Sequence, residues 1–257
     1  MPNRIIDFVK MALPRLSVQA LPAGRPDYLH FPHLYRYPAV ETSYADGNRR
    51  FFPPRENMRP IELFAVRYNV CTVPGFRFIR TNNRQQMLMF IDGACSNNGN
   101  PEACGGCGVV YTSTHFRSGI AYPLEKDGTQ HTNNRAVLRA AILALEMRLW
   151  NGEGFNKVVL ACDSEYVVKG VSEWLSEWVI NGWKTSDGTA VKNKDLWEIL
   201  LETLRRQESR GVLVQFWLIP REWNEADEYA KKGSVSDSLF LPRGTRKLMV
   251  LPPGQAR

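Results

Sequence analysis

Three aspartates occupy positions where a folded chain can bring them together. Asp92 and Asp163 each follow a short apolar run of the kind that forms a buried strand, and Asp227 lies in the first turn of a predicted helix. The carboxyl ends of parallel strands meet at one edge of a sheet, where binding sites form. Gathered carboxylates repel one another, so a fold that gathers them usually binds a cation as well. Because oxygen ligands suit Mg²⁺ or Mn²⁺ better than Zn²⁺, we predict that these three acids hold such an ion.

The elements that position these acids follow from the apolar periodicity of residues 86–235. Three strands come first, then a long helix, a fourth strand, two helices, a fifth strand and a final helix. A strand that reaches the next strand through a helix pairs with it in parallel, whereas the opening meander pairs antiparallel. We therefore predict an α/β domain with a mixed five-stranded sheet of order βββαβααβα. The strands are expected at 87–91, 108–112, 119–122, 158–161 and 212–219, and the helices at 132–149, 166–180, 196–204 and 225–232.

Residues 1–85 differ from this domain in composition. Prolines recur from Pro14 to Pro74 and prevent long helices, so we predict a partly disordered, irregular extension. It holds 13 Lys and Arg against 6 Asp and Glu, whereas residues 86–257 hold 20 of each, so the whole net charge of +7 lies in the extension. A basic arm with interleaved aromatic residues suits a nucleic-acid partner, and it can equally pack onto the domain. Residues 236–257 are assigned to a C-terminal tail.

The cysteines and the apolar runs indicate an intracellular protein. The chain has five cysteines, an odd number at low density, which is typical of reduced thiols. Cys104 and Cys107 form a Cys-Gly-Gly-Cys segment, with Cys95 as a possible third ligand, but a second cysteine pair that would favour zinc is missing. The sequence contains no run of 18 apolar residues, so we predict no membrane-spanning helix. We expect a cytoplasmic or nuclear location, and the basic N-terminus leaves a mitochondrial one open.

Five sequence blocks resemble the type 1 ribonuclease H family, and they occur in the family's order over about 150 residues. The chain has the first-strand motif at residues 92–101 and the helix-opening motif at residues 132–136. It has the third motif at residues 163–167, the substrate-handling segment at residues 178–197 and the last acidic motif at residues 224–227. Together these blocks are highly specific. The resemblance implies the ribonuclease H-like fold for residues 86–235.

The resemblance also implies an activity and a set of site residues. Family members cleave the RNA strand of an RNA–DNA hybrid with two Mg²⁺ ions, one activating water and the other stabilising the leaving oxygen. Asp92 would bridge both ions, and Asp163 and Asp227 would each bind one side. The residues expected to contact the RNA strand are Asn98, Asn133 and Asn134. Three tryptophans either border the groove for the DNA strand or belong to the core, namely Trp174, Trp178 and Trp183.

The chain departs from the family pattern at position 137. The family has glutamate directly after the Asn-Asn-Arg-Ala segment, and this chain has Val137, which offers no oxygen to a cation. Glu146 lies nine residues further along the same helix, roughly 13 Å away, and is too distant to replace it. Glu165, Glu225 and Glu228 are nearer to the other acids in sequence. The chain also lacks the histidine that many members carry before the last acidic motif.

Three functions are therefore open at this point. The first is a Mg²⁺-dependent endoribonuclease on RNA–DNA hybrids, attenuated by Val137. The second is a catalytically inactive module that binds hybrid or double-stranded RNA. The third is a scaffold or adaptor that uses the fold and the basic arm to bind partners. The family resemblance favours cleavage, and Val137 argues against it.

Overall fold

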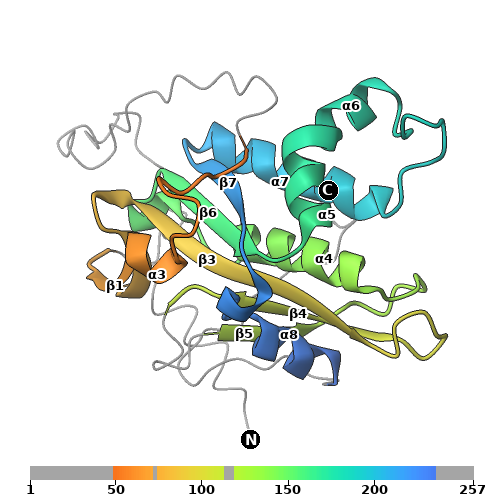
Figure 1. Ribbon diagram of the computed structural model, residues 1–257, viewed down its shortest axis with the longest axis horizontal. Helices are drawn as coiled ribbons and strands as arrows, with labels where there is room; N and C mark the ends of the chain where they lie inside the picture. Colours follow the sequence, from red (N-terminus) through yellow and green to blue (C-terminus); the bar gives the residue numbers. More distant parts are fainter. Residues whose placement is uncertain (1–48, 72–73, 113–118, 236–257) are drawn as a thin grey trace, which may run out of the picture. The chain divides into compact units, whose positions relative to one another are not determined.

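The computed structural model describes residues 49–71, 74–112 and 119–235, which form one mixed sheet with helices on both faces (Figure 1). The predicted tail and the first 48 residues of the extension lie outside these ranges. No helix in the described part of the chain is long and apolar enough to cross a membrane. The strands are β1 (Phe64–Asn69), β2 (Gly75–Arg80), β3 (Asn83–Ser96), β4 (Cys104–Val110), β5 (Gly119–Pro123), β6 (Lys157–Cys162) and β7 (Leu213–Leu218). The helices are α3 (Pro60–Leu63), α4 (Asn133–Glu146), α5 (Glu165–Lys169), α6 (Leu175–Ile180), α7 (Lys194–Ser209) and α8 (Asp227–Ser234).

The predicted order of elements is confirmed from β3 to α8. β3 pairs antiparallel with β4 and parallel with β6, and β6 pairs parallel with β7. The meander at one side of the sheet and the parallel strands at its centre are those expected of the ribonuclease H-like fold. The crossover through α4 makes β3 and β6 neighbours, so Asp92, within β3, and Asp163, directly after β6, both lie just past the last parallel pair, Phe90 with Ala161.

The structure adds two strands that the sequence analysis had assigned to the irregular extension. β1 and β2 form an antiparallel hairpin, and β2 pairs with the start of β3, so the sheet has seven strands instead of five. The prolines in this region do not interrupt these strands. Pro60 opens the short helix α3, where its missing N–H costs nothing, and Pro74 precedes β2. Our expectation of an irregular segment is therefore wrong for residues 60–69 and 75–80, which form α3, β1 and β2.

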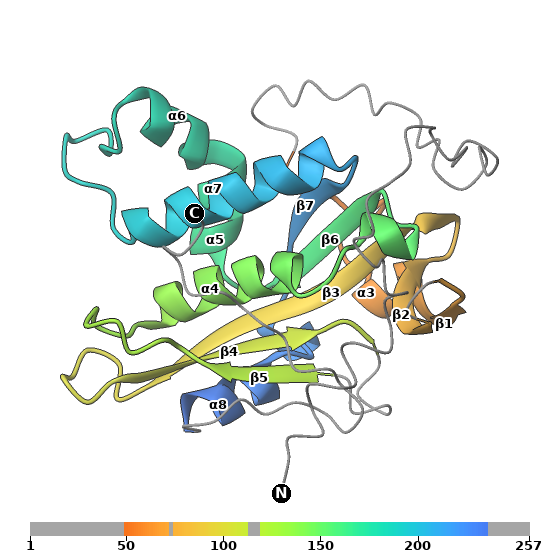
Figure 2. The ribbon, with the colours of Figure 1, turned by 180° about the vertical axis from the view of Figure 1, so that it is seen from behind.

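The first core lies between the sheet and the layer formed by α4, α5 and α7. The apolar run of β3 alternates between faces, and Met87, Met89 and Ile91 point into this core. α4 begins at Asn133 because the Thr132 side chain accepts a hydrogen bond from the backbone N–H of Arg135. Figure 2 shows α4 and α7 side by side across this face. α4 thus carries position 137 over the sheet.

The second core covers the opposite face and uses residues from before the predicted domain. Leu88 and Phe90 of β3 point into it, and α8 covers one part of it. Phe51 covers another part, with ring centroids 4.9 Å from Trp217 and 6.2 Å from Phe64. Phe51 N–H donates to the Phe216 carbonyl, and Phe216 N–H donates to the Arg49 carbonyl. Residues 49–51 therefore extend the sheet beside β7.

Candidate active site

Asp92 lies on the central strand β3 and is almost completely buried, with 6% of its surface exposed. The next residue, Gly93, lets α4 approach closely. A Cβ atom there would lie 2.1 Å from the backbone nitrogen of Val137 and 2.5 Å from the carbonyl carbon of Ala136. Only glycine permits this approach, because such contacts are far shorter than van der Waals separation. The start of α4 is thereby packed directly beside Asp92.

Asp163 follows β6 and is oriented by Asn224. The Asn224 side-chain amide donates to Asp163 Oδ1 at 2.9 Å and to the backbone carbonyl of Ile91 at 3.1 Å. Asn224 is buried, and its own Oδ1 accepts the N–H of Ala226. One amide therefore connects the middle of β3 and the residue after β6 to the loop before α8. This bridge fixes Asp163 relative to the strand that carries Asp92.

Asp227 opens α8 and is held by two basic side chains. Arg221 Nη2 donates to Asp227 Oδ1 at 2.8 Å, and Lys231 Nζ donates to Oδ2 at 2.5 Å. Although partial burial raises the pKa of the Asp227 carboxyl, these two hydrogen bonds outweigh it and lower the pKa below its usual value. Both of its oxygens thus have partners within the protein.

Val137 is buried in the first core, with 4% of its surface exposed, and contributes no polar atom to the site. Three of the four glutamates considered as replacements bind basic residues. Glu146 binds Arg206 of α7, Glu165 binds Lys169 at 2.7 Å, and Glu228 binds Lys232 at 2.6 Å. The site therefore keeps three aspartates, and these three glutamates are engaged elsewhere.

The three aspartates lie close enough to interact electrostatically. The pKa of Asp92 is raised from 3.8 to about 7, mainly by burial and then by the negative charge of Asp163, with a smaller contribution from Asp227. The backbone N–H of Gly93 and the guanidinium of Arg221 oppose this rise. In the folded protein, Asp92 therefore competes for a proton near neutral pH.

The raised pKa predicts how Asp92→Asn changes stability in EDTA. The pKa is higher in the folded state, so the folded protein binds the extra proton between about pH 4 and pH 7, and stability falls as pH rises through that window. The variant lacks this penalty and should be more stable than wild type at pH 8, by about 2–4 kcal/mol. Urea unfolding at pH 4 and pH 8 measures the difference, which should vanish at the lower pH. An equal difference at both pH values would contradict the raised pKa.

The side chains of this site have the right chemistry for a divalent ion, but they are not arranged to hold one. Carboxylate oxygens are the ligands that such ions prefer, and a cation would relieve the repulsion around Asp92. However, no group of three Asp, Glu, His or Cys side chains in the described ranges is arranged to hold a metal ion. Asp227 is bound to Arg221 and Lys231 instead. The aspartates thus offer suitable ligands without forming a preassembled metal centre.

The three asparagines predicted to contact RNA line one hollow of about 690 Å³. Asn98 comes from the β3–β4 turn, and Asn133 and Asn134 come from the first turn of α4. All three are exposed. Behind them, Arg135 pairs with both carboxylate oxygens of Asp195 at 2.9 and 2.6 Å, which ties the start of α4 to the start of α7. The structure therefore brings the three asparagines together on a surface that the Arg135–Asp195 ion pair stabilises.

The tryptophans divide between core and surface. Trp178 is buried, and its ring centroid lies 5.7 Å from Trp174 and 5.3 Å from Trp197. Trp183 is half-buried, and Lys194 Nζ lies 5.9 Å from its ring centroid. Trp197 packs directly on Gly170, where a Cβ would lie 2.2 Å from the indole. Trp178 thus serves mainly as a core residue, whereas Trp183 keeps a face toward solvent.

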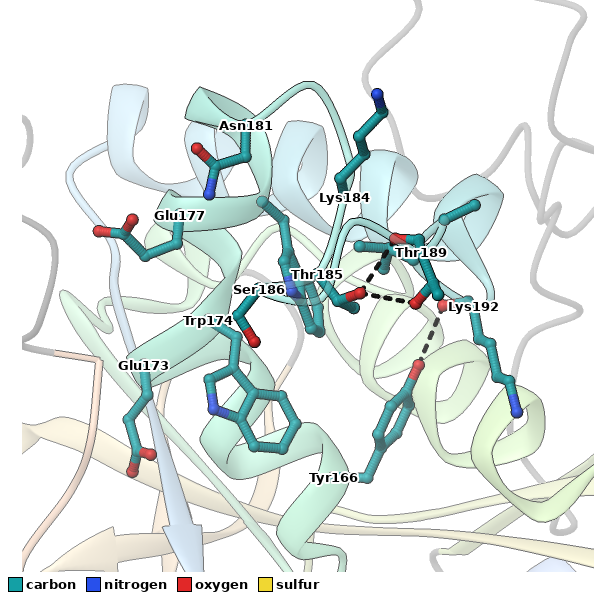
Figure 3. A pocket seen from close by; sticks show the side chains of 13 residues that line it. Tyr166, Glu173, Trp174, Glu177, Asn181, Lys184, Thr185, Ser186, Thr189 and Lys192 are labelled. Carbon is teal, nitrogen blue, oxygen red and sulfur yellow. Dashed lines mark hydrogen bonds between the residues drawn. The ribbon is translucent and has the colours of Figure 1, made fainter.

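Beside these rings lies a second hollow of about 550 Å³, between α5, α6 and the loop 184–192 (Figure 3). Its floor includes Trp174, and its wall includes Tyr166, whose hydroxyl donates to the Lys192 carbonyl at 3.1 Å. Thr185 and Thr189 hydrogen bond to each other and close the loop. The predicted substrate-handling segment therefore forms a defined concave surface.

The Cys-Gly-Gly-Cys segment does not form a thiol pair. Both residues lie on β4, three positions apart, so their side chains point to opposite faces of the sheet. Cys104 is exposed, whereas Cys107 is buried and contacts the Ala136 carbonyl. All five cysteines are free in the structure.

Four residues that shape the site had no assigned role in the sequence analysis: Arg221, Asn224, Lys231 and Asp195. The sequence could have indicated only one of these roles. Lys231 follows Asp227 by four residues on a predicted helix, which is the spacing of a surface ion pair. The roles of the other three depend on how loops and distant helices meet. Arg221 in particular reaches Asp227 from a short 3-10 turn, Arg221–Trp223.

The fold and the site define an α/β protein with an aspartate cluster where the parallel pairing of β3 with β6 ends and α8 begins. The family model for RNase H matches residues 84–234. The chain is 40% identical over 152 residues to a ribonuclease H of Aromatoleum aromaticum, covering 58% of this chain and 90% of that protein. It is 36% identical over 155 residues to a ribonuclease HI of Haemophilus influenzae, covering 60% and 94%.

Among solved structures, the chain resembles LC9-RNase H1, which is described as a type 1 RNase H with the type 2 active-site motif. The identity is 26% and the TM-score 0.45, over 62% of this chain and 78% of that chain. The extent of the family match and the sequence identities lead to one conclusion. The chain belongs to the RNase H family and resembles its type 1 members.

Proposed function

We propose that this protein acts on RNA–DNA hybrids, cutting the RNA strand endonucleolytically, and that Val137 attenuates this cleavage. The observation that carries the proposal is the placement of the buried Asp92 beside Asp163, which Asn224 fixes to β3, with Asp227 near enough to raise the pKa of Asp92. A structural role alone does not require a buried carboxylate beside two others, because such a cluster is costly in the absence of a cation. Perturbed acids of this kind are concentrated at functional sites.

The chain's residues divide the work of binding and chemistry. The hollow lined by Asn98, Asn133 and Asn134 offers amides that donate to and accept from 2′-hydroxyls, which distinguish RNA from DNA. The half-buried Trp183 and the neighbouring loop offer a surface for the DNA strand. The family's two-metal reaction uses four carboxylates and Mg²⁺ or Mn²⁺, and this chain offers three. We therefore expect incomplete metal occupancy and a slow reaction.

A second candidate function is hybrid binding without cleavage. It is favoured by Val137 and by the two cations already bound to Asp227, since both features weaken a metal site and leave the asparagine-lined hollow intact. The two candidates share a substrate and differ only in turnover.

A cleavage assay on a labelled RNA–DNA hybrid with the full chain tests the proposal. With Mn²⁺, wild type should cut the RNA strand slowly, and Asp92→Asn should abolish cutting while still binding the hybrid. Glu228→Gln is a matched control, because Glu228 lies beside Asp227 on α8 but pairs with Lys232. It should cut at the wild-type rate. Binding without cutting by wild type would favour the second candidate, and failure to bind at low salt would refute both.

A further inference from the structure

Asp227 already has two cations of its own. Its Oδ1 accepts from Arg221 at 2.8 Å and its Oδ2 accepts from Lys231 at 2.5 Å, so each carboxylate oxygen has a charged donor. Asp163 has a neutral partner, the amide of Asn224, at 2.9 Å. The three aspartates thus differ in their partners, and Asp227 alone is neutralised by basic side chains among the ion pairs of the described residues.

These cations are placed by local structure on both sides of Asp227. Lys231 lies one helical turn after Asp227 on α8. Arg221 opens the 3-10 turn Arg221–Trp223, which is closed by hydrogen bonds from Trp223 N–H to Pro220 O and from Asn224 N–H to Arg221 O. Arg59 lies over the Trp223 ring, 5.8 Å from its centroid. The backbone that carries Arg221 is therefore ordered.

The side chains themselves remain free to move away. Arg221 is 69% exposed and Lys231 is 61% exposed, whereas Asp227 is 24% exposed. Exposed ion pairs of this kind are weak, so a more highly charged competitor can displace them. A divalent cation that approaches Asp227 has to displace Arg221 and Lys231 before the carboxylate can become its ligand.

We propose that Arg221 and Lys231 are resident counter-cations of Asp227 that compete with a divalent metal ion for this carboxylate. They compensate the aspartate cluster in the metal-free protein, and metal binding requires their release. The inference rests on the proposed function, because it takes the aspartates as metal ligands. According to this inference, Arg221 and Lys231 lower the affinity for the metal ion, and they do so independently of the missing acid at position 137.

Mn²⁺ titration of the full chain without nucleic acid tests this competition, with free Mn²⁺ followed by electron paramagnetic resonance. Arg221→Gln and Lys231→Gln should each tighten Mn²⁺ binding roughly two- to fivefold, the amount expected from removing an exposed ion pair. The double variant should tighten it further. Arg221→Lys keeps a cation at the position and should stay near wild type.

Lys232→Gln is the matched control, because Lys232 is the next residue on α8 and pairs with Glu228 instead. Its Mn²⁺ affinity should equal that of wild type. Unchanged or weaker Mn²⁺ binding in the double variant would overturn the inference, as would an equal gain in Lys232→Gln, which would indicate a general effect of net charge. Circular dichroism of each variant verifies the fold.

The titration separates this inference from the proposed function. A gain in Mn²⁺ affinity without hybrid cleavage by wild type would support the competition and reject catalysis. Hybrid cleavage by wild type with no gain in the double variant would support catalysis and reject the competition.

Discussion

Val137→Glu is expected to raise the rate of RNA-strand cleavage in an RNA–DNA hybrid by about 100-fold or more. The substitution places a fourth carboxylate on α4, at the point where the helix packs against Gly93 beside Asp92. A metal-ion site contributes several kcal/mol to catalysis, and roughly 3 kcal/mol of transition-state stabilisation corresponds to such a factor. Single-turnover cleavage with saturating Mn²⁺ measures the gain.

Val137→Gln separates charge from shape in this experiment. Val137 is buried, so either polar side chain is expected to lower the free energy of unfolding by about 1–3 kcal/mol. Only glutamate supplies an ionised ligand, and the glutamine variant should remain at the wild-type rate. Equal rates in the two variants would mean that position 137 is not what limits cleavage.

Glu153→Gln is expected to lower the free energy of unfolding by about 3–5 kcal/mol, because it leaves a buried arginine without its counter-ion. Glu153 Oε2 accepts from Arg77 Nε and Nη2, both at 2.9 Å, and its other oxygen binds Arg148. The Glu153 side chain is 3% exposed and that of Arg77 4%. Urea unfolding of the full chain measures the loss.

Two further variants test whether the buried pair itself causes this effect. The double variant Arg77→Met with Glu153→Leu removes both charges and should be more stable than Glu153→Gln alone. Arg148 is 20% exposed, so Arg148→Ala should cost less than Glu153→Gln. If the double variant lost as much free energy of unfolding as Arg77→Met and Glu153→Leu lose together, the result would contradict the pairing.

Local signals in the sequence were sufficient for the central fold. Met87–Ile91 is apolar on both faces because β3 is covered on both sides, and Thr132 caps α4 where the pattern placed its start. The acids Asp92 and Asp163 could be located because each ends an apolar run. These features depend on neighbours within a few residues and on a right-handed crossover, and both are strongly constrained.

Features that depend on distant contacts could not be predicted in this way. Residues 64–69 alternate as strands do, but the prolines before and after them suggested an irregular segment. The Arg77–Glu153 pair that anchors the hairpin joins residues 76 positions apart. The packing of Trp178 against Trp174 and Trp197 could not be predicted from the spacing of the tryptophans. Arg221 reaches Asp227 only because of how the loop before α8 turns.

The pairing of residues 49–51 with β7 bears on where this protein can be divided. A chain cut at residue 84, where the family match begins, would lose Phe51, Phe64 and Phe78 from the second core. It would expose Trp217 and leave the edge of β7 unpaired at Phe216, and unpaired strand edges recruit other chains into aggregates. We therefore expect a fragment that begins at residue 49 to be more stable and more soluble than one that begins at residue 84.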